Sequence, residues 1–332
     1  MKKQQNKFLI IFIVLILSMF TYLILYSINK DKEIKIINDI PKEEIILEKP
    51  IRLLFVGDIM LDRGVSFKAE RNGTSTIFAG VRDIFKEYDI VIGNLEGTMT
   101  DNKSVSRKNS KILRFTFDPL YSEVLKSAGF HILSLANNHT LDFYKDGYEQ
   151  TVKNLNNVGI LSFGSARNEY NLSNKIIIKD KTFCFIGYHD LFTHNEQSAI
   201  DEINNIRNEC NFTTVFVHWG DEYSTTSNKR QKTLADKFVN ADADLIIGSH
   251  PHVVQEYAIV NNKAVFYSLG NFVFDQDFSY ETKHGIMVGL DIFKDKIDFK
   301  LIPIEIENAQ VSMDIKKDIE KFTIINEPKL EP

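Results

Sequence analysis

The sequence predicts an α/β fold for the region after residue 50. Apolar, β-branched runs of four to seven residues alternate there with segments of helical periodicity. Such runs suit strands that are buried on both faces of a sheet. Their alternation with helices is typical of α/β proteins. The predicted strands are IRLLFVG (51–57), DIVIGN (89–94), HILSLA (131–136), TTVFVHW (213–219) and DLIIGSH (244–250).

Helices and hairpins are predicted between and after these strands. Two of the helical segments close on a glycine, which commonly terminates a helix. The predicted helices cover residues 75–88, 118–130, 146–159 and 228–241. A short polar turn between two strand-like runs predicts a hairpin, and this pattern adds antiparallel strands to the C-terminal half. The predicted hairpins cover residues 174–188, 255–269 and 285–306.

The N-terminal segment differs in composition from the rest of the chain. Residues 8–28 read FLIIFIVLILSMFTYLILYSI and contain no charged residue. As a helix this segment would extend about 32 Å, close to the ~30 Å hydrocarbon core of a bilayer. Lys2, Lys3 and Lys7 precede it, so the positive-inside rule places the N-terminus in the cytoplasm and the later chain outside. The alternative is a cleaved signal peptide, which would have a shorter apolar stretch and a small-residue cleavage site.

These features divide the chain into four predicted parts. Residues 1–29 form a cytoplasmic stub and a single-pass membrane anchor, and residues 30–50 form a linker. Residues 51–310 form the folded, extracellular domain. Residues 311–332 form a polar tail in which we expect little order.

Composition limits the partners and the covalent structure. The chain has 40 Lys and Arg against 45 Asp and Glu, a formal net charge of −5, which gives no reason to expect nucleic-acid binding. Its two cysteines, Cys184 and Cys210, are too few for a disulfide-stapled scaffold. We expect both to be buried and unpaired. A disulfide in an oxidising compartment stays open as the alternative, because the sequence does not give their separation.

Side chains that can bind a metal ion follow five of the predicted strands. In an open α/β sheet the carboxyl ends of the strands form the crevice in which ligands bind, so residues far apart in sequence can meet there. Carboxylate, amide and imidazole ligands together suit Mn²⁺, Fe²⁺ or Zn²⁺. The candidate ligands are Asp58, Glu96, Asn138, His218, His250 and His252.

Each candidate has an ordinary structural explanation when it is taken alone. An aspartate after a strand often caps a helix, and a buried histidine is often only hydrogen-bonded. The occurrence of such side chains after five separate predicted strands favours a shared metal site instead. In His250-Pro251-His252 an extended backbone would send both imidazoles to one face, and the proline would stiffen it. Asp142 can orient the imidazole of His139, although a turn followed by a helix cap explains the same residues.

Six short motifs carry these residues and their neighbours. They are GDIMLDRG (57–64), GNLEGT (93–98), SLANNHTLD (134–142), VHWGDEY (217–223), GSHPHVVQ (248–255) and YSLGNFVFDQ (267–276). Their order and spacing, from about Leu53 to about Asp291, resemble the CapA/PgsA family of poly-γ-glutamate capsule proteins. That family is similar to the calcineurin-like metallophosphoesterases. The resemblance implies a four-layer α/β/β/α sandwich with a two-metal centre between strand ends.

The resemblance also implies a role for individual residues. The six candidates named above become the metal ligands, with Glu96 in the bridging position. His139 becomes the general acid and Asp142 its orienting partner. The pattern departs at Met60, where metallophosphoesterases have a histidine ligand, so one metal position loses a ligand.

Four further residues flank the motifs. Arg63 can pair with a carboxylate or phosphate of a substrate, and a solvated surface arginine is the alternative. Trp219, Tyr223 and Phe272 can wall a pocket, or they can belong to the core.

The function implied by the resemblance is the biosynthesis, export or trimming of an anionic polymer such as poly-γ-glutamate. The protein would sit in the bacterial cell membrane through residues 8–28, beside membrane-bound capsule synthase subunits. One or two divalent ions, Mn²⁺, Zn²⁺ or Fe²⁺, would support hydrolysis of an amide or ester bond. Two alternatives stay open. One is a non-catalytic scaffold subunit of a polymer synthase complex, and the other is a secreted metallophosphodiesterase, against which Met60 counts.

Overall fold

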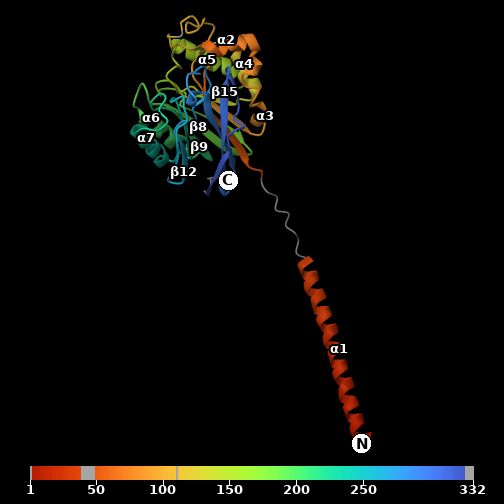
Figure 1. Cartoon of the computed structure of the whole chain (residues 1–332). Helices are drawn as coiled ribbons and strands as arrows, with labels where there is room; N and C mark the ends of the chain where they lie inside the picture. The colour runs from red at the N-terminus through yellow and green to blue at the C-terminus, as the bar shows by residue number, and fades with distance from the viewer. Residues whose placement is uncertain (1, 39–48, 110, 326–332) are drawn as a thin grey trace. The chain divides into compact units, whose positions relative to one another are not determined.

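The computed structural model describes residues 2–38, 49–109 and 111–325, in two compact units, Met1–Glu48 and Lys49–Pro332 (Figure 1). The first unit contains one helix, α1 (Lys2–Asn38). Within α1, Asn6–Lys32 is long and apolar enough to cross a membrane, with a mean hydropathy of 3.0. The helix includes residues 30–38 of the predicted linker, and residues 39–48 of that linker lie outside the described residues.

The second unit is built around two β-sheets. The larger sheet contains, in spatial order, β16 (Gln310–Met313), β15 (Lys296–Glu307), β14 (His284–Ile292), β1 (Ile51–Ile59), β2 (Ile90–Leu95), β5 (Ile132–Ser134) and β6 (Leu161–Phe163). Two more strands join it, β13 (Asn271–Val273) beside β1 and β17 (Glu320–Ile325) beside β15. Strands β1, β2, β5 and β6 are parallel, whereas β14 and β15 are antiparallel, as the sequence predicts for the C-terminal half.

The smaller sheet completes the strand layers. In spatial order it contains β11 (Tyr257–Val260), β12 (Lys263–Phe266), β10 (Leu245–Ser249), β9 (Phe212–His218), β8 (Lys181–His189) and β7 (Ser173–Ile178). A separate short pair is formed by β3 (Thr98–Met99) and β4 (Thr116–Phe117). The helices of this unit are α2 (Arg63–Asn72), α3 (Arg82–Phe85), α4 (Tyr121–Ala128), α5 (Tyr144–Asn157), α6 (Glu196–Ile206) and α7 (Lys229–Asn240), with two 3₁₀ turns, η1 (Thr74–Thr76) and η2 (Glu281–Lys283).

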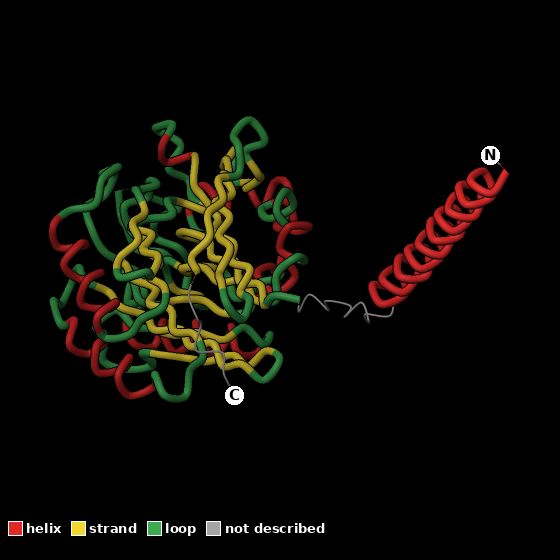
Figure 2. Tube along the Cα trace, turned by 90° about the horizontal axis from the view of Figure 1, so that it is seen from below, coloured by secondary structure: helices red, strands yellow, loops and turns green. Residues whose placement is uncertain are grey.

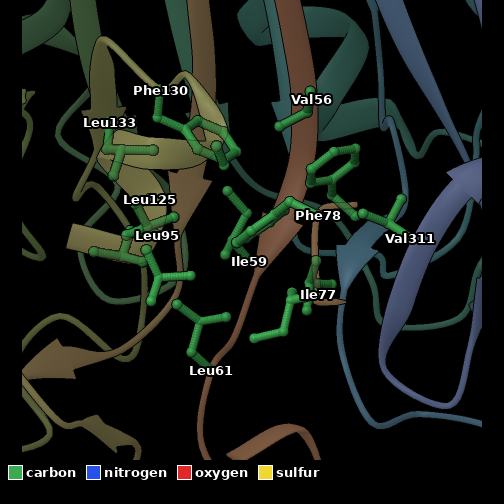
Figure 3. Packing of buried hydrophobic residues seen from close by; sticks show 14 of the residues in the cluster. Val56, Ile59, Leu61, Ile77, Phe78, Leu95, Leu125, Phe130, Leu133 and Val311 are labelled. Atoms are coloured by element: carbon green, nitrogen blue, oxygen red, sulfur yellow. The ribbon is translucent and has the colours of Figure 1, made fainter. Parts of the chain in front are cut away.

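Three buried apolar clusters separate four layers. Successive side chains of β1 alternate between two of them: Leu54 and Val56 face α2 to α5, and Leu53 and Phe55 face the smaller sheet. The third cluster lies between the smaller sheet and helices α6 and α7. Figure 3 shows part of the first cluster, with Val56 among the labelled residues.

This layering confirms the predicted four-layer α/β/β/α sandwich. Figure 2 shows the strands in the middle of the domain with helices on both outer sides. In Figure 1, α6 and α7 lie beside β8 and β9, and α3 lies on the opposite side, beyond β15. All five strands predicted from apolar runs are present, in β1, β2, β5, β9 and β10.

The prediction of a helix over residues 75–88 is wrong for most of that range. The structure has only η1 and the four-residue α3 in this region. The reason is pairing with β16, because Val311 N donates to Ile77 O at 2.9 Å and Gly80 forms a bridge with Ser312. A backbone bonded to a strand cannot also complete helical hydrogen bonds.

The prediction that residues 311–332 form a polar tail with little order is wrong as far as Ile325. Strand β17 pairs with β15, with Phe322 opposite Phe299 and Ile324 opposite Ile297. The two phenylalanine rings stack with centroids 4.7 Å apart. Phe322 and Ile324 alternate along the strand and join the apolar cluster between the two sheets, which explains why a mostly polar segment is ordered. Residues 326–332 lie outside the described residues.

The expectation of unpaired cysteines is also wrong. Cys184 on β8 and Cys210, just before β9, form a disulfide with their Cα atoms 5.8 Å apart. The bridge closes a loop with a sequence separation of 26 residues. A chain-entropy model gives such a loop a stabilisation of about 3 to 4 kcal/mol. Disulfides of this kind persist in oxidising compartments.

Candidate metal centre

Strand ends from both sheets meet in one polar cluster. Asn138 follows β5 of the larger sheet, and its Oδ1 lies 2.9 Å from Nε2 of His218 at the end of β9. The backbone N–H of His250, which follows β10, donates to Oδ2 of Asp58 at 3.1 Å. The structure thus brings together the six residues that the sequence predicts as metal ligands.

Asp58 is fully buried at the end of β1. Its backbone N–H donates to the Gly270 carbonyl at 3.1 Å. Only glycine fits at position 57, because a Cβ atom there would lie 1.9 Å from that carbonyl oxygen. Oδ1 of Asp58 accepts a hydrogen bond from Asn94 at 2.8 Å, so the carboxylate is held in one orientation.

The carboxylate of Glu96 occupies the centre of the cluster. It is fully buried, and neither oxygen has a hydrogen-bond partner among the described residues. Oε1 lies 3.8 Å from Nε2 of His139 and 3.8 Å from Nε2 of His252. Burial raises the pKa of Glu96 well above its usual value; His252 opposes this shift and Asp58 adds to it. A buried carboxylate without hydrogen bonds is the arrangement that a bound cation would complete.

His218 is oriented by polar neighbours on both sides of its ring. Nδ1 lies 3.0 Å from Ser249 Oγ and 3.3 Å from Asn94 Nδ2, and Nε2 faces Asn138. Burial lowers the pKa of His218 well below its usual value, and neighbouring His250 lowers it further. A lowered pKa favours the neutral imidazole, which is the form that binds metals.

The His-Pro-His segment differs from the extended conformation that the sequence predicts. Strand β10 ends at Ser249, and His250 and His252 have positive φ angles of 97° and 60°. Strained residues of this kind are concentrated at functional sites. The two rings still converge, with centroids 5.8 Å apart.

The two histidines of this segment carry opposite pKa shifts. Burial, and then the charge of His252, lowers the pKa of His250 to about 3. Burial also disfavours the charged form of His252, but Glu96 and Asp58 outweigh it and raise the pKa of His252 to about 9. Without a metal ion, a proton on His252 thus balances part of the negative charge of the two carboxylates.

His139 and Asp142, for which the resemblance implies an acid and its orienting partner, lie in contact. Nδ1 of His139 lies 2.8 Å from Oδ2 of Asp142, which also accepts the Phe115 N–H at 2.7 Å. The ring of Phe115 packs on the imidazole, with centroids 4.2 Å apart. The carboxylate fixes Nδ1 as a donor, and Nε2 is left facing Glu96 and the cavity.

A cavity of about 270 Å³ opens over this cluster. Its lining includes Glu96, His139, Glu222, Tyr223, His252 and Arg63. The alternative of a solvated surface arginine is wrong, because the Arg63 side chain is 13% exposed, is ion-paired with Asp275 and lies over the Phe115 ring at 4.8 Å. Of the three aromatic residues predicted to wall a pocket, Tyr223 does so, whereas Trp219 and Phe272 are fully buried in the core.

Comparison with known proteins identifies the family. The sequence profile of the family described as bacterial capsule synthesis protein PGA_cap matches residues 52–276. The chain belongs to this capsule synthesis family. The PGA biosynthesis protein CapA of Bacillus subtilis (strain 168) is 31% identical over 310 residues, which cover 86% of this chain and 80% of the relative.

Two further proteins are similar to this member of the capsule synthesis family. The capsule biosynthesis protein CapA of Bacillus anthracis is 30% identical over 259 residues, which cover 72% of this chain and 63% of that protein. A solved structure described as a novel phosphatase, from Mycoplasma pneumoniae, has a TM-score of 0.47 and 16% identity, and the match covers 83% of this chain and 94% of the phosphatase.

The donor set of this capsule synthesis protein fits a divalent cation. Asp58, Glu96 and His218 each offer a ligand atom within 4.8 Å of the others. Because Glu96 has no protein partner in the described part of the chain, a cation there would satisfy a carboxylate that is otherwise buried alone. Mixed oxygen and imidazole ligands suit Mn²⁺, Fe²⁺ or Zn²⁺.

Three polar residues at the cluster are missing from the predicted set. Asn94 donates to Asp58 and contacts His218, and it stands two residues before Glu96 in the GNLEGT motif. Glu222 lies in the VHWGDEY motif, within 4.8 Å of ligand atoms on two histidines. His189 is the last residue of β8 and pairs with His218 on β9. The observation that predicted the other candidate ligands, a metal-binding side chain at the end of an apolar strand, therefore applies to His189 as well.

Proposed function

We propose that this chain is an outward-facing, membrane-anchored component of capsule biosynthesis whose metal centre hydrolyses an amide or ester bond of a poly-γ-glutamate-type polymer. The main support is Glu96, a fully buried carboxylate with no protein partner in the described part of the chain, among histidines and carboxylates from several strand ends. The names of the relatives, PGA biosynthesis protein and capsule biosynthesis protein, support the polymer class.

The proposed chemistry assigns distinct tasks to the protein's own groups. Asp58, Glu96 and His218 would hold the divalent ion, which when bound lowers the pKa of water and polarises a carbonyl oxygen. Water adds to the carbonyl carbon, the C–N bond breaks, and the leaving nitrogen takes a proton from Nε2 of His139. The proton lost by water returns to His139 through solvent. Asp142 stabilises the cationic imidazole between these transfers.

The cavity offers limited recognition of an anionic chain. The guanidinium of Arg63 is already paired with Asp275, so it would contact a substrate carboxylate through its remaining N–H donors. Phe115 supports the faces of both Arg63 and His139, which keeps these two groups in fixed positions. A short polymer segment bound in this cavity would lie beside the acid.

Hydrolysis of the polymer tests the proposal directly. The full chain, purified in detergent and supplied with Mn²⁺ or Zn²⁺, is expected to shorten poly-γ-glutamate and release new amino groups, because the proposed acid and cation lie in one cavity. Chelation with EDTA should stop the release. Turnover of bis(p-nitrophenyl) phosphate without polymer cleavage would point to the phosphodiesterase alternative. Metal binding without either activity would point to the scaffold.

The proposed location rests on helix α1 and on the disulfide. Asn6–Lys32 of α1 is long and apolar enough to cross a membrane, and the Cys184–Cys210 bond suits an oxidising compartment. We expect the full chain to stay in the membrane fraction after carbonate extraction, and a version beginning at Lys49 to be soluble. External protease should degrade the domain on intact protoplasts. A full-length, uncleaved chain in the medium would contradict the anchor.

A further inference from the structure

We propose that the basic loop, residues 101–109 and 111–114 between β3 and β4, binds a long polyanionic chain and guides it to the cavity that contains His139. The identity of the polymer rests on the proposed function, whereas the binding surface does not. Five Lys or Arg residues and one acidic residue occur within residues 101–114, in a chain whose formal net charge is −5. A locally positive surface on an acidic protein concentrates anionic ligands at that surface.

The two arginines of the basic loop hold it in place. Nη1 and Nη2 of Arg107 donate to the two carboxylate oxygens of Glu70 on α2, at 2.6 and 2.7 Å. Nε and Nη2 of Arg114 donate to the carbonyl oxygen of Asp142, at 2.9 and 2.7 Å. These bonds tie the loop to α2 and to the turn that carries Asp142. The loop therefore has a defined shape before a ligand arrives, which reduces the entropy lost on binding.

The three lysines of the basic loop are available to a ligand. Lys103, Lys108 and Lys111 are exposed, and their ammonium groups have no ion-pair or hydrogen-bond partner in the described part of the chain. An ammonium group is a compact charge on a flexible stem, so it can follow a carboxylate whose position varies along a mobile polymer. Within the loop, the arginines thus serve the fold and the lysines are left to bind.

A cavity of about 840 Å³ beside the basic loop receives two of these lysines, Lys103 and Lys108. The acidic residues of its lining are Asp62, Glu70, Asp101 and Asp118. All of these except Asp101 accept hydrogen bonds from protein donors among the described residues. The unpaired charge in this cavity is therefore two lysines against one aspartate, which suits an anionic occupant.

The other end of the basic loop reaches the smaller cavity, which contains the proposed acid. Leu113 lines that cavity with His139, and Lys111 stands two residues before Leu113. Phe115 lines the smaller cavity and the next residue, Thr116, lines the larger one, so the two cavities are neighbours. A polymer too long for the smaller cavity can extend over the loop into the larger one. A flat anionic membrane surface cannot enter either cavity, so we assign the loop to the polymer.

Binding of labelled polymer without metal tests this inference separately from hydrolysis. The full chain, in neutral detergent with EDTA, is titrated into fluorescein-labelled poly-γ-glutamate, and fluorescence anisotropy gives the dissociation constant. The loop variant, with Lys103→Gln, Lys108→Gln and Lys111→Gln combined, should bind about 10-fold more weakly at low salt, because three exposed charge contacts are lost. High salt should shrink this difference, since it screens such contacts. A short oligomer that fills only the smaller cavity should bind both proteins equally.

The matched control combines Lys153→Gln, Lys229→Gln and Lys294→Gln, three exposed lysines on α5, on α7 and between β14 and β15. It changes the net charge equally and should keep the wild-type affinity. Unchanged affinity in the loop variant would overturn this inference and leave an anionic membrane surface as the partner of the loop. Equal losses in the loop variant and the control would also overturn it, because net charge alone would explain them. Loop-dependent binding without hydrolysis in the presence of metal would overturn the proposed function alone.

Discussion

Glu96→Gln is expected to abolish divalent metal binding while the metal-free protein keeps its stability. Glu96 shares a group of possible ligands with Asp58 and His218, and its Oε1 lies 3.8 Å from Nε2 of His252, so losing its charge weakens cation binding in this cluster. In the metal-free protein Asp58 also faces His252 and can balance its charge alone, so a neutral glutamine of similar shape at position 96 leaves no new unpaired charge. The free energy of unfolding without metal should therefore change by less than about 1 kcal/mol, within the range of a substitution that creates no new unpaired charge. Elemental analysis and thermal unfolding measure the two effects.

Asp62→Asn provides a matched control for Glu96→Gln. Asp62 is also buried and lies four residues after Asp58, but its oxygens accept hydrogen bonds from Arg63 N at 2.7 Å, Ser104 Oγ at 2.7 Å and Thr116 N at 3.1 Å. Because protein donors satisfy it, its replacement should lower stability and leave the metal content unchanged. If Glu96→Gln kept the wild-type metal content, the metal centre would have to be assigned elsewhere.

His139→Ala is expected to reduce hydrolysis by about 10² to 10⁴-fold, the usual contribution of a positioned general acid. The bound metal should remain, because His139 is assigned to proton transfer and not to ligation. Asp142→Asn should act in the same direction with a smaller effect, since it weakens the orientation and charge stabilisation of the ring but leaves the acid in place. Turnover of the polymer and metal content, measured on the same preparations, separate the two roles. Loss of metal equal to the loss of rate would show that His139 is a ligand.

Local patterns in the sequence predicted the α/β strands and the convergence of the site, whereas the four layers were implied by the family resemblance. Runs such as residues 51–57 and 213–219 are apolar on both faces, and buried strands of a covered sheet require that pattern. Polar residues directly after such runs must lie at the carboxyl end of the sheet. Asp58 and His218 could thus be placed in one cluster although 160 positions separate them.

Features set by contacts distant in sequence could not be predicted in this way. The short helices in residues 75–88 and the strand β17 both depend on pairing with strands far along the chain. The disulfide depends on the alignment of β8 and β9, because Cys184 and Cys210 have no local signal of proximity. Glu222 lies on a loop whose path is fixed by the hydrogen bond from the Tyr223 N–H to the Pro251 carbonyl and not by periodicity.

The number of divalent ions bound per chain tests the central claim most directly. The full chain is purified in detergent, reconstituted with Mn²⁺ or Zn²⁺, freed of excess metal and analysed for elements, beside Glu96→Gln treated identically. We predict at least one ion per wild-type chain and none in Glu96→Gln, because the buried carboxylate at the centre of the cluster has no other partner in the described part of the chain. A wild-type chain without bound metal after reconstitution would contradict the account.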